Sequence, residues 1–401
     1  MIRKLSILTG AALFSLLTAM AQKEPADYVN PFVGTTNYGT TNPGALCPQG
    51  MMSVTPLNVL GAVPENKINK DSTWWSTPYE FNNKYMTGFA HVNLSGVGCP
   101  ELGSLLLMPT TGKLNVDFNT YGSVYSNESA TPGYYTNVLD KYNVKCEVTA
   151  TPRTSMARFT FPAGQSNILL NLGEGLTNES GATVRFVNDR EIEGTKLLGT
   201  FCYNPQAVFP IYFVMRINKV PAKRGYWKMM RPMGVEAQWD DTAGKYKLYT
   251  SYTKEISGDD VGAWFTFDST VSETIEVSMG VSFVSIENAR LNLEKEQPFG
   301  TTFDKLRAEA RKMWNDDLSR VTVKGGTEEQ KGVFYTAMYH TLIHPNILQD
   351  VSGQYPQMEG DKILTTNRNR YTVFSLWDTY RNVHQLMTLV YPERQMDMIH
   401  T

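Results

Sequence analysis

The chain has 401 residues, a formal net charge of −2 and 19% charged residues. That length exceeds what one hydrophobic core usually organises and is enough for two domains. The near-zero charge gives no sign of an electrostatic nucleic-acid surface, and an aromatic content of 11% is typical of a globular chain and not of a disordered one.

The first 21 residues have the pattern of a secretory signal peptide. Arg3 and Lys4 precede an apolar stretch over residues 5–17, and residues 19–21 form an A-x-A cleavage pattern. The apolar stretch is short for a membrane span, and no later stretch is apolar enough to cross a membrane. We therefore expect an exported protein, periplasmic or extracellular, whose mature chain begins at Gln22.

Four cysteines, at positions 47, 99, 146 and 202, allow three pairings in an exported protein. Their wide spacing matches no compact disulfide framework, so buried free thiols are the favoured interpretation and a disulfide stays open. No Cys/His pair has the spacing of zinc ligands.

Strand-like patterns dominate from about residue 25 to residue 287. Apolar and polar residues alternate clearly over 143–150, 155–161 and 275–281. Turn residues separate such segments, at 132–133, 162–164, 188–189 and 241–244. Many short strands with frequent turns predict an antiparallel β-sandwich domain over residues 22–297.

The period becomes helical after Pro298. Apolar residues recur every three to four positions from Phe303 to Leu318 and include Met313. We interpret residues 298–324 as a connecting helix and linker.

Three further helices are predicted within residues 325–401. A capping box at 327–330 opens the first, which ends before Pro345. The next runs from about Thr372 to Val390, and Pro392 suits the first turn of the last. A few apolar helices without closing partners expose more apolar surface than soluble proteins tolerate. We therefore expect the truncated start of a larger helical domain, with a helical pair packed on the sandwich as the alternative.

Polar groups suited to a sugar ligand cluster in two segments of the predicted sandwich. A loop rich in Gly, Pro and Asn lets backbone approach a ligand closely, and a later segment offers side chains that can bond sugar hydroxyls. The candidates on this side are Gly50, Met51, Trp75, His91, Asn93 and Glu101. The alternatives are ordinary turn chemistry, a structural histidine and core packing of the tryptophan.

The segment around residue 378 forms a third unusual pattern. On one continuous helix, Asp378, Arg381 and Gln385 would share a stripe, with Trp377 and His384 beside it. A polar stripe among bulky apolar residues is costly if it is buried and unpaired. Either Asp378 pairs with Arg381, or both reach a polar ligand.

Together these segments resemble the family 92 glycoside hydrolases. The resemblance rests on YVNPFVGT at 28–35, NPGA at 42–45, PQGM at 48–51, GFAH at 88–91, LSG at 94–96, MPTTG at 108–112, PGYY at 132–135 and FSLWDTYR at 374–381. It spans nearly the whole mature chain in the right order.

The members of this family are exo-acting, calcium-dependent α-mannosidases that invert the anomeric configuration. They have an N-terminal β-sandwich and a C-terminal (α/α)6 barrel, with the active site between them. The resemblance therefore implies hydrolysis of terminal α-linked mannose from mannosides, N-glycans or mannans, of the exo-α-1,2 type, with Ca²⁺ as cofactor. It also implies that Asp378, supported by Trp377 and Arg381, binds the terminal sugar while the Gly50 loop and the His91 segment close the pocket.

Two departures from the family pattern leave the linkage open. Residues 92–98 read VNLSGVG where the family often has THLSGTG, and residues 48–51 read PQGM where PFGM is usual. In the family, the general acid, the general base and most calcium-binding groups lie in the barrel beyond Thr401, so we assign no catalytic carboxylate to this chain. The alternatives are a non-catalytic glycan-binding β-sandwich module, and a related hydrolase or phosphorylase acting on another sugar.

Overall fold

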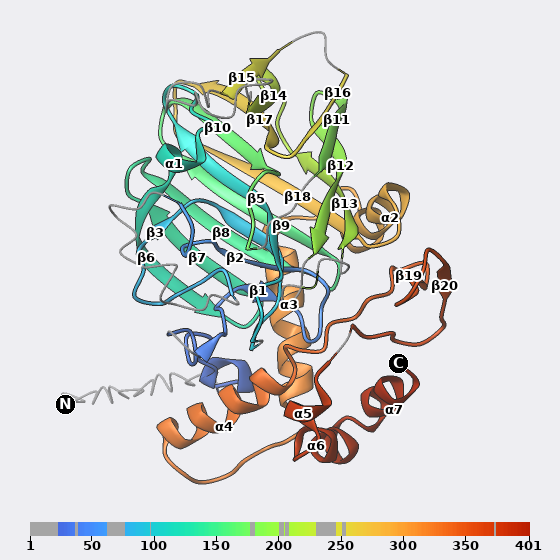
Figure 1. The fold of residues 1–401 in the computed structure, drawn as a ribbon. Helices are drawn as coiled ribbons and strands as arrows, with labels where there is room; N and C mark the ends of the chain where they lie inside the picture. The colour runs from blue at the N-terminus through green and yellow to red at the C-terminus, as the bar shows by residue number, and fades with distance from the viewer. Residues whose placement is uncertain are drawn as a thin grey trace, which may run out of the picture.

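The computed structural model describes residues 23–36, 39–61, 77–96, 98–176, 181–199, 204, 208–229, 246–250, 254–372 and 374–401. The predicted signal peptide, the turn at 241–244 and Trp75 lie outside these ranges. Two β-sheets lie face to face, and most of the helices gather at one end of them (Figure 1). Within the described ranges, no helix is both long and apolar enough to cross a membrane.

One layer of the sandwich is an eight-stranded sheet whose neighbouring strands are all antiparallel. Its order is β1 (Ala45–Leu46), β2 (Ser53–Pro56), β4 (Phe89–Asn93), β5 (Leu102–Thr111), β10 (Gly164–Asn171), β17 (Val261–Ser269), β14 (Lys223–Met229) and β15 (Tyr246–Tyr249). In the middle, β10 pairs with β17 from Gly164 opposite Ser269 to Asn171 opposite Gly262. The short helix α1 (Phe118–Tyr121) is tied to this sheet, because Asn171 Nδ2 donates to Tyr121 Oη at 3.1 Å.

The other layer is a ten-stranded antiparallel sheet. Its order is β16 (Glu255–Gly258), β11 (Ala182–Asn188), β12 (Glu191–Gly199), β13 (Val208–Ile217), β18 (Glu273–Ser282), β9 (Thr154–Phe161), β8 (Val144–Ala150), β7 (Tyr134–Leu139), β6 (Ser123–Thr131) and β3 (Tyr85–Met86). The strands predicted over 143–150, 155–161 and 275–281 are thus confirmed as β8, β9 and β18.

The main core lies between the two sheets. Ile168 and Phe265 from the first sheet and Phe159 and Val277 from the second are buried in one cluster. Along β18, buried Ile275, Val277 and Met279 alternate with more exposed neighbours, as the sequence pattern indicated. Removing these side chains from water is the main force that joins the sheets, and the predicted β-sandwich is confirmed.

Two helices flank the ten-stranded sheet. α2 (Ile286–Glu296) packs on β18 and was not predicted. Two of its four buried residues are the polar Asn288 and Asn292, so the buried face of this helix does not appear as an apolar period in the sequence. α3 (Phe303–Leu318) confirms the connecting helix. Its apolar face is as predicted except at Met313, which is 36% exposed.

α4 (Glu328–Thr341) begins at the predicted capping box. Thr327 Oγ1 accepts from Gln330 N, and Gln330 Oε1 accepts from Thr327 N. Two backbone donors that the first turn leaves without helical partners are thereby satisfied.

A second core fastens these helices to the sandwich. The Trp314 ring from α3 and the Tyr339 ring from α4 lie 4.5 Å apart, centroid to centroid. Trp314 Nε1 donates to the backbone oxygen of Leu46 in β1 at 2.7 Å. The short 3-10 helix η1 (Pro25–Tyr28) adds Ala26 to this cluster.

The single helix predicted from about Thr372 to Val390 is wrong. The structure has one turn, α5 (Leu376–Thr379), followed by α6 (Val383–Val390), because Asn382 between them leaves the helical region with φ −152° and ψ −18°. Short amide side chains compete for local backbone groups and favour helix ends, which a periodicity argument does not register. α7 (Pro392–His400) begins with proline, as predicted.

A small hairpin completes the helical region: β19 (Gln354–Pro356) pairs with β20 (Ile363–Thr365). The mainly β part followed by several helices is as predicted, but the helices described do not confirm the start of an (α/α)6 barrel. The boundaries at residues 297 and 324 remain predictions.

The cysteines divide into two kinds. Cys47 and Cys146 are buried free thiols, and burial raises the pKa of each. Cys99 is disulfide-bonded, an outcome that the sequence left open, and Cys202 lies outside the described residues. A disulfide suits the oxidising compartment that an exported protein enters.

Trp314→Ala tests the second core. Removing a fully buried indole and its bond to Leu46 should lower the free energy of unfolding by about 3–5 kcal/mol. The matched control Met313→Ala, at the neighbouring and partly exposed position, should cost no more than about 0.5 kcal/mol. Urea unfolding followed by circular dichroism measures both. Equal costs for the two variants would contradict the role given to Trp314.

Candidate functional site

The loop between β1 and β2 carries the predicted residues Gly50 and Met51 and meets the helical region. Gln49 N donates to the backbone oxygen of Leu342 at 2.7 Å, and Gln49 O accepts from Ile347 N at 2.8 Å. Met51 is buried in the sandwich core. The loop is therefore held from the helical side by its backbone and from the sandwich side by a side chain.

Asn346 links this loop to the segment that leads to α5. Its Nδ2 donates to the backbone oxygens of Gly50 at 2.7 Å and Ile343 at 3.0 Å. Thr372 N donates to Asn346 O at 2.8 Å, and Asn346 N donates to Thr372 Oγ1 at 3.3 Å. The sequence analysis missed Asn346, because an irregular segment has no period; the only local signal is Pro345, which ends the preceding helix.

A buried carboxylate fastens the same segment to α2. Asp350 is 1% exposed and accepts from Ser282 Oγ at 2.7 Å, Asn288 Nδ2 at 2.8 Å and Asn292 Nδ2 at 2.6 Å. Burial raises the pKa of Asp350, and these hydrogen bonds oppose that shift. The segment from Leu342 to Asp350 is thus fixed at both ends.

His91, on β4, is 1% exposed, and its Nδ1 lies 2.8 Å from the backbone oxygen of Leu105. Because a carbonyl oxygen only accepts, Nδ1 carries a proton. Burial lowers the pKa of His91 to about 4, so the ring is neutral at pH 7. This environment favours the structural alternative that the sequence left open for His91.

Asn93 ties β4 to β2 beside the Gly50 loop. Its Nδ2 donates to the backbone oxygens of Ser53 at 3.2 Å and Ala90 at 2.9 Å, and its N donates to Ser53 Oγ at 2.8 Å. Within the described ranges its buried Oδ1 has no hydrogen-bond partner. Glu101 is also buried, and its Oε1 accepts from Leu102 N at 3.2 Å.

The predicted residues on the helical side are exposed. Asp378 and Trp377 lie on α5, and Trp377 is 73% exposed. The guanidinium of Arg381 lies over the rings of Trp377 and Tyr380, with its carbon 5.5 Å and 5.6 Å from their centroids. The predicted helical stripe of Asp378, Arg381 and Gln385 is wrong, because α5 ends at Thr379, before Arg381, and Gln385 lies on the separate helix α6. Among the described residues, Asp378 and Arg381 do not form an ion pair with each other.

The two halves of the predicted site are connected indirectly. Hydrogen bonds link the Gly50 loop to the segment before α5 through Asn346 and Thr372 and also through Gln49 and Tyr371. A cavity of about 380 Å³ lies beyond Thr372, between α5, α6 and α7. It is lined by Met358, Thr372, Phe374, Leu376, His384, Gln395, Met398, Ile399 and Thr401. Trp377 and Asp378 are not among these lining residues, and their side chains are exposed at the protein surface.

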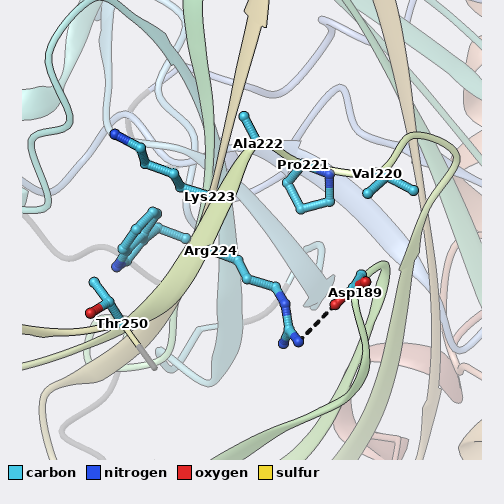
Figure 2. A pocket seen from close by; sticks show the side chains of 8 residues that line it. Asp189, Val220, Pro221, Ala222, Lys223, Arg224 and Thr250 are labelled. Atoms are coloured by element: carbon cyan, nitrogen blue, oxygen red, sulfur yellow. Dashed lines mark hydrogen bonds and ion pairs between the residues drawn. The ribbon is translucent and has the colours of Figure 1, made fainter. Parts of the chain in front are cut away.

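A second cavity, of about 390 Å³, lies beside the turn after β11 and the start of β14, where Asp189, Lys223 and Arg224 are among its lining residues (Figure 2). Arg224 Nη2 pairs with Asp189 Oδ1 at 2.9 Å, whereas Lys223 leaves the strand in the opposite direction (Figure 2). The charged groups do not converge on one point, so the cavity does not gather a catalytic constellation.

The resemblance implies a calcium ion, whose ligands are oxygen atoms. Among the described residues, three or more His, Cys, Asp or Glu side chains do not gather into a group that could hold a metal ion. Hard cations such as Ca²⁺ need several oxygen ligands around one point. The described residues therefore offer no cluster of these side chains around one point.

The protein thus consists of a β-sandwich and a helical region, joined through the buried loop around Gly50. Each of the two parts matches a known domain. Residues 28–282 match the glycosyl hydrolase family 92 N-terminal domain, and residues 288–401 match the glycosyl hydrolase family 92 catalytic domain. The chain belongs to glycosyl hydrolase family 92.

Three similar proteins agree with this. The structure of a family GH92 alpha-mannosidase from Bacteroides thetaiotaomicron is 30% identical, with a TM-score of 0.80, over 94% of this chain and 48% of its own. A GH92 family glycosyl hydrolase, ccman5, is 25% identical with a TM-score of 0.77, over 94% and 48%. An uncharacterized secreted glycosidase from Arthroderma benhamiae is 25% identical over 94% and 48%. The chain thus spans about half the length of these relatives.

The buried His91 predicts a pH dependence of stability. Its folded pKa of about 4 lies below the ordinary value of 6.5, so between these pH values the unfolded chain binds a proton that the folded chain does not. Stability should therefore fall as the pH decreases from 6.5 to 4, by up to about 3 kcal/mol from this group.

His91→Asn keeps a donor toward Leu105 and removes the titration. We expect the urea midpoint of this variant to change less between pH 6.5 and pH 4 than that of the wild type. Parallel curves for the two proteins over this range would show that His91 is not the group responsible.

Proposed function

We propose that this protein hydrolyses terminal α-linked mannose from mannosides, N-glycans or mannans. The observation that carries the proposal is that residues 288–401 match the family's catalytic domain, directly after a match to its N-terminal domain. Another structure of the Bacteroides thetaiotaomicron enzyme is a complex with mannoimidazole, a mannose-like ligand, and covers 94% of this chain at 30% identity. A non-catalytic glycan-binding module is not favoured, because such a module needs no catalytic domain.

In this proposal the helical side binds the terminal sugar. The exposed carboxylate of Asp378 accepts hydrogen bonds from sugar hydroxyls, which charge makes stronger than neutral ones. The open face of Trp377 packs against the apolar face of the ring, and Arg381, stacked on Trp377, keeps N–H groups for further hydroxyls. The Gly50 loop forms the opposite wall, at a position that Asn346 fixes.

The reaction type is proposed from the family. An inverting glycosidase places a general acid and a general base roughly 6.5–9.5 Å apart, so that a water fits between the base and the anomeric carbon. Neither carboxylate is assigned to a residue of this chain, and the linkage proposed from the family is α-1,2. Export is proposed with it, in line with the relative named as secreted and with the disulfide at Cys99.

Asp378→Asn tests sugar binding. Replacing a charged acceptor by a neutral amide should weaken the binding of mannoimidazole by about 10- to 100-fold. Isothermal titration calorimetry measures this, and the matched control Asp361→Asn, an exposed carboxylate in the loop between β19 and β20, should bind as the wild type does. No binding by the wild type at millimolar mannoimidazole, or equal binding by Asp378→Asn, would sink the assignment.

Calcium dependence is proposed from the family alone. Bound Ca²⁺ would supply a hard positive charge that polarises sugar oxygens. With the family's catalytic domain complete, mannose release from α-1,2-mannobiose should stop in excess EDTA and recover when Ca²⁺, but not Mg²⁺, is restored. NMR of the first product should show β-mannose. Activity that persists in EDTA would remove calcium from the proposal and leave the substrate assignment standing.

A further inference from the structure

The turn that carries Trp377 and Asp378 has little support of its own. α5 spans Leu376–Thr379, and Ser375 at its N-cap makes no side-chain capping bond. Leu376 and Trp377 are 64% and 73% exposed. A single turn is unstable without tertiary contacts, because helix nucleation fixes several dihedral angles for each bond gained. Some other group must hold these two side chains in one orientation.

His384 is the side chain that reaches the end of α5. It lies on α6, and its Nε2 is 2.9 Å from Thr379 Oγ1, directly after Asp378 in the chain. Its Nδ1 is 3.1 Å from Gln395 Oε1 on α7. Its ring also packs against Phe374, with centroids 5.8 Å apart, on the wall of the 380 Å³ cavity. From its place on α6, this one imidazole therefore contacts α5, α7 and Phe374 in the segment before α5.

The hydrogen-bond pattern gives this contact a direction. Gln395 Oε1 is an acceptor, so His384 Nδ1 donates to it. Thr379 Oγ1 has one proton and two neighbours, the backbone oxygen of Ser375 at 2.9 Å and His384 Nε2 at 2.9 Å. The hydroxyl either closes the turn onto Ser375 or donates to His384. Because Nδ1 carries the proton of the neutral ring, Nε2 only accepts, so the imidazole, which α7 holds through Gln395, holds the last residue of α5 when the Thr379 hydroxyl donates to His384.

We propose that His384 is a positioning residue for sugar binding: it orients Trp377 and Asp378 by bonding Thr379 at one ring nitrogen and Gln395 at the other. The inference rests on the proposed function, because it takes Asp378 as the group that contacts the sugar. His384 itself does not touch the sugar in this assignment. A displaced binding group costs affinity steeply, because hydrogen bonds to a ligand depend on both distance and angle.

Two variants separate the hydrogen bonds from the packing of the ring. His384→Phe keeps an aromatic ring beside Phe374 and removes both hydrogen bonds, and His384→Gln restores an amide that can donate and accept. His400→Phe, at an exposed histidine on α7, is the matched control. Mannoimidazole affinity is measured by calorimetry, and thermal unfolding is measured on the same samples.

We expect His384→Phe to weaken mannoimidazole binding at least about tenfold. His384→Gln should recover most of that loss, His400→Phe should bind as the wild type does, and none of the three should shift the unfolding midpoint by more than a few degrees. Thr379→Val should produce a similar loss, and the double variant should lose no more than either single one, since both remove the same link.

A local readout makes the test independent of the sugar. Fluorine NMR of fluorotryptophan-labelled protein reports the surroundings of Trp377, whose signal is assigned with Trp377→Phe. The signal should shift or broaden in His384→Phe and stay unchanged in His400→Phe.

The outcomes separate this inference from the proposed function. Wild-type binding together with unchanged affinity in His384→Phe overturns the positioning role and leaves the function standing. Absence of wild-type binding sinks the function, and the fluorine signal then decides the positioning alone: a shift supports it, and an unchanged signal overturns it.

Discussion

The exchange of backbone hydrogen bonds between Gln49 and the segment from Leu342 to Ile347 is the constraint on which the arrangement of this protein depends. Buried backbone groups must find partners, and here each part of the protein supplies them for the other. Neither the sandwich loop nor the segment after α4 can move alone without leaving a buried N–H or C=O unpaired. The two walls proposed for the sugar site therefore share one frame.

Gln49 is also one of the departures from the family pattern, since residues 48–51 read PQGM where PFGM is usual. Where phenylalanine is usual, the side chain of Gln49 is 2% exposed, and its Oε1 accepts from Tyr371 Oη at 3.2 Å. A polar contact thus joins the loop to the strand-like segment that leads to α5. The side-chain oxygen of Gln49 is therefore bonded at the joint between the two parts, one residue from the proposed wall at Gly50, whereas its buried Nε2 has no partner among the described residues.

The two sides of the proposed site differ in how firmly they are held. On the sandwich side, Asn93 and the Gly50 loop are buried and bonded on several faces. On the helical side, Trp377 and Asp378 lie on one exposed turn whose end is held by His384. Binding geometry should therefore be most sensitive to changes around α5, since few contacts there resist displacement.

The sequence by itself determined the sandwich, the capping box at Thr327 and the apolar face of α3, because these features depend on local periodicity and on side-chain bonds a few residues away. It also determined the family through ordered motifs. Only the tertiary structure decided the break at Asn382, the helix α2 behind its buried asparagines, and the roles of Asn346 and Asp350. The helix α2, Asn346 and Asp350 are held by partners far along the chain, and the break at Asn382 is a backbone conformation that a periodicity argument does not register.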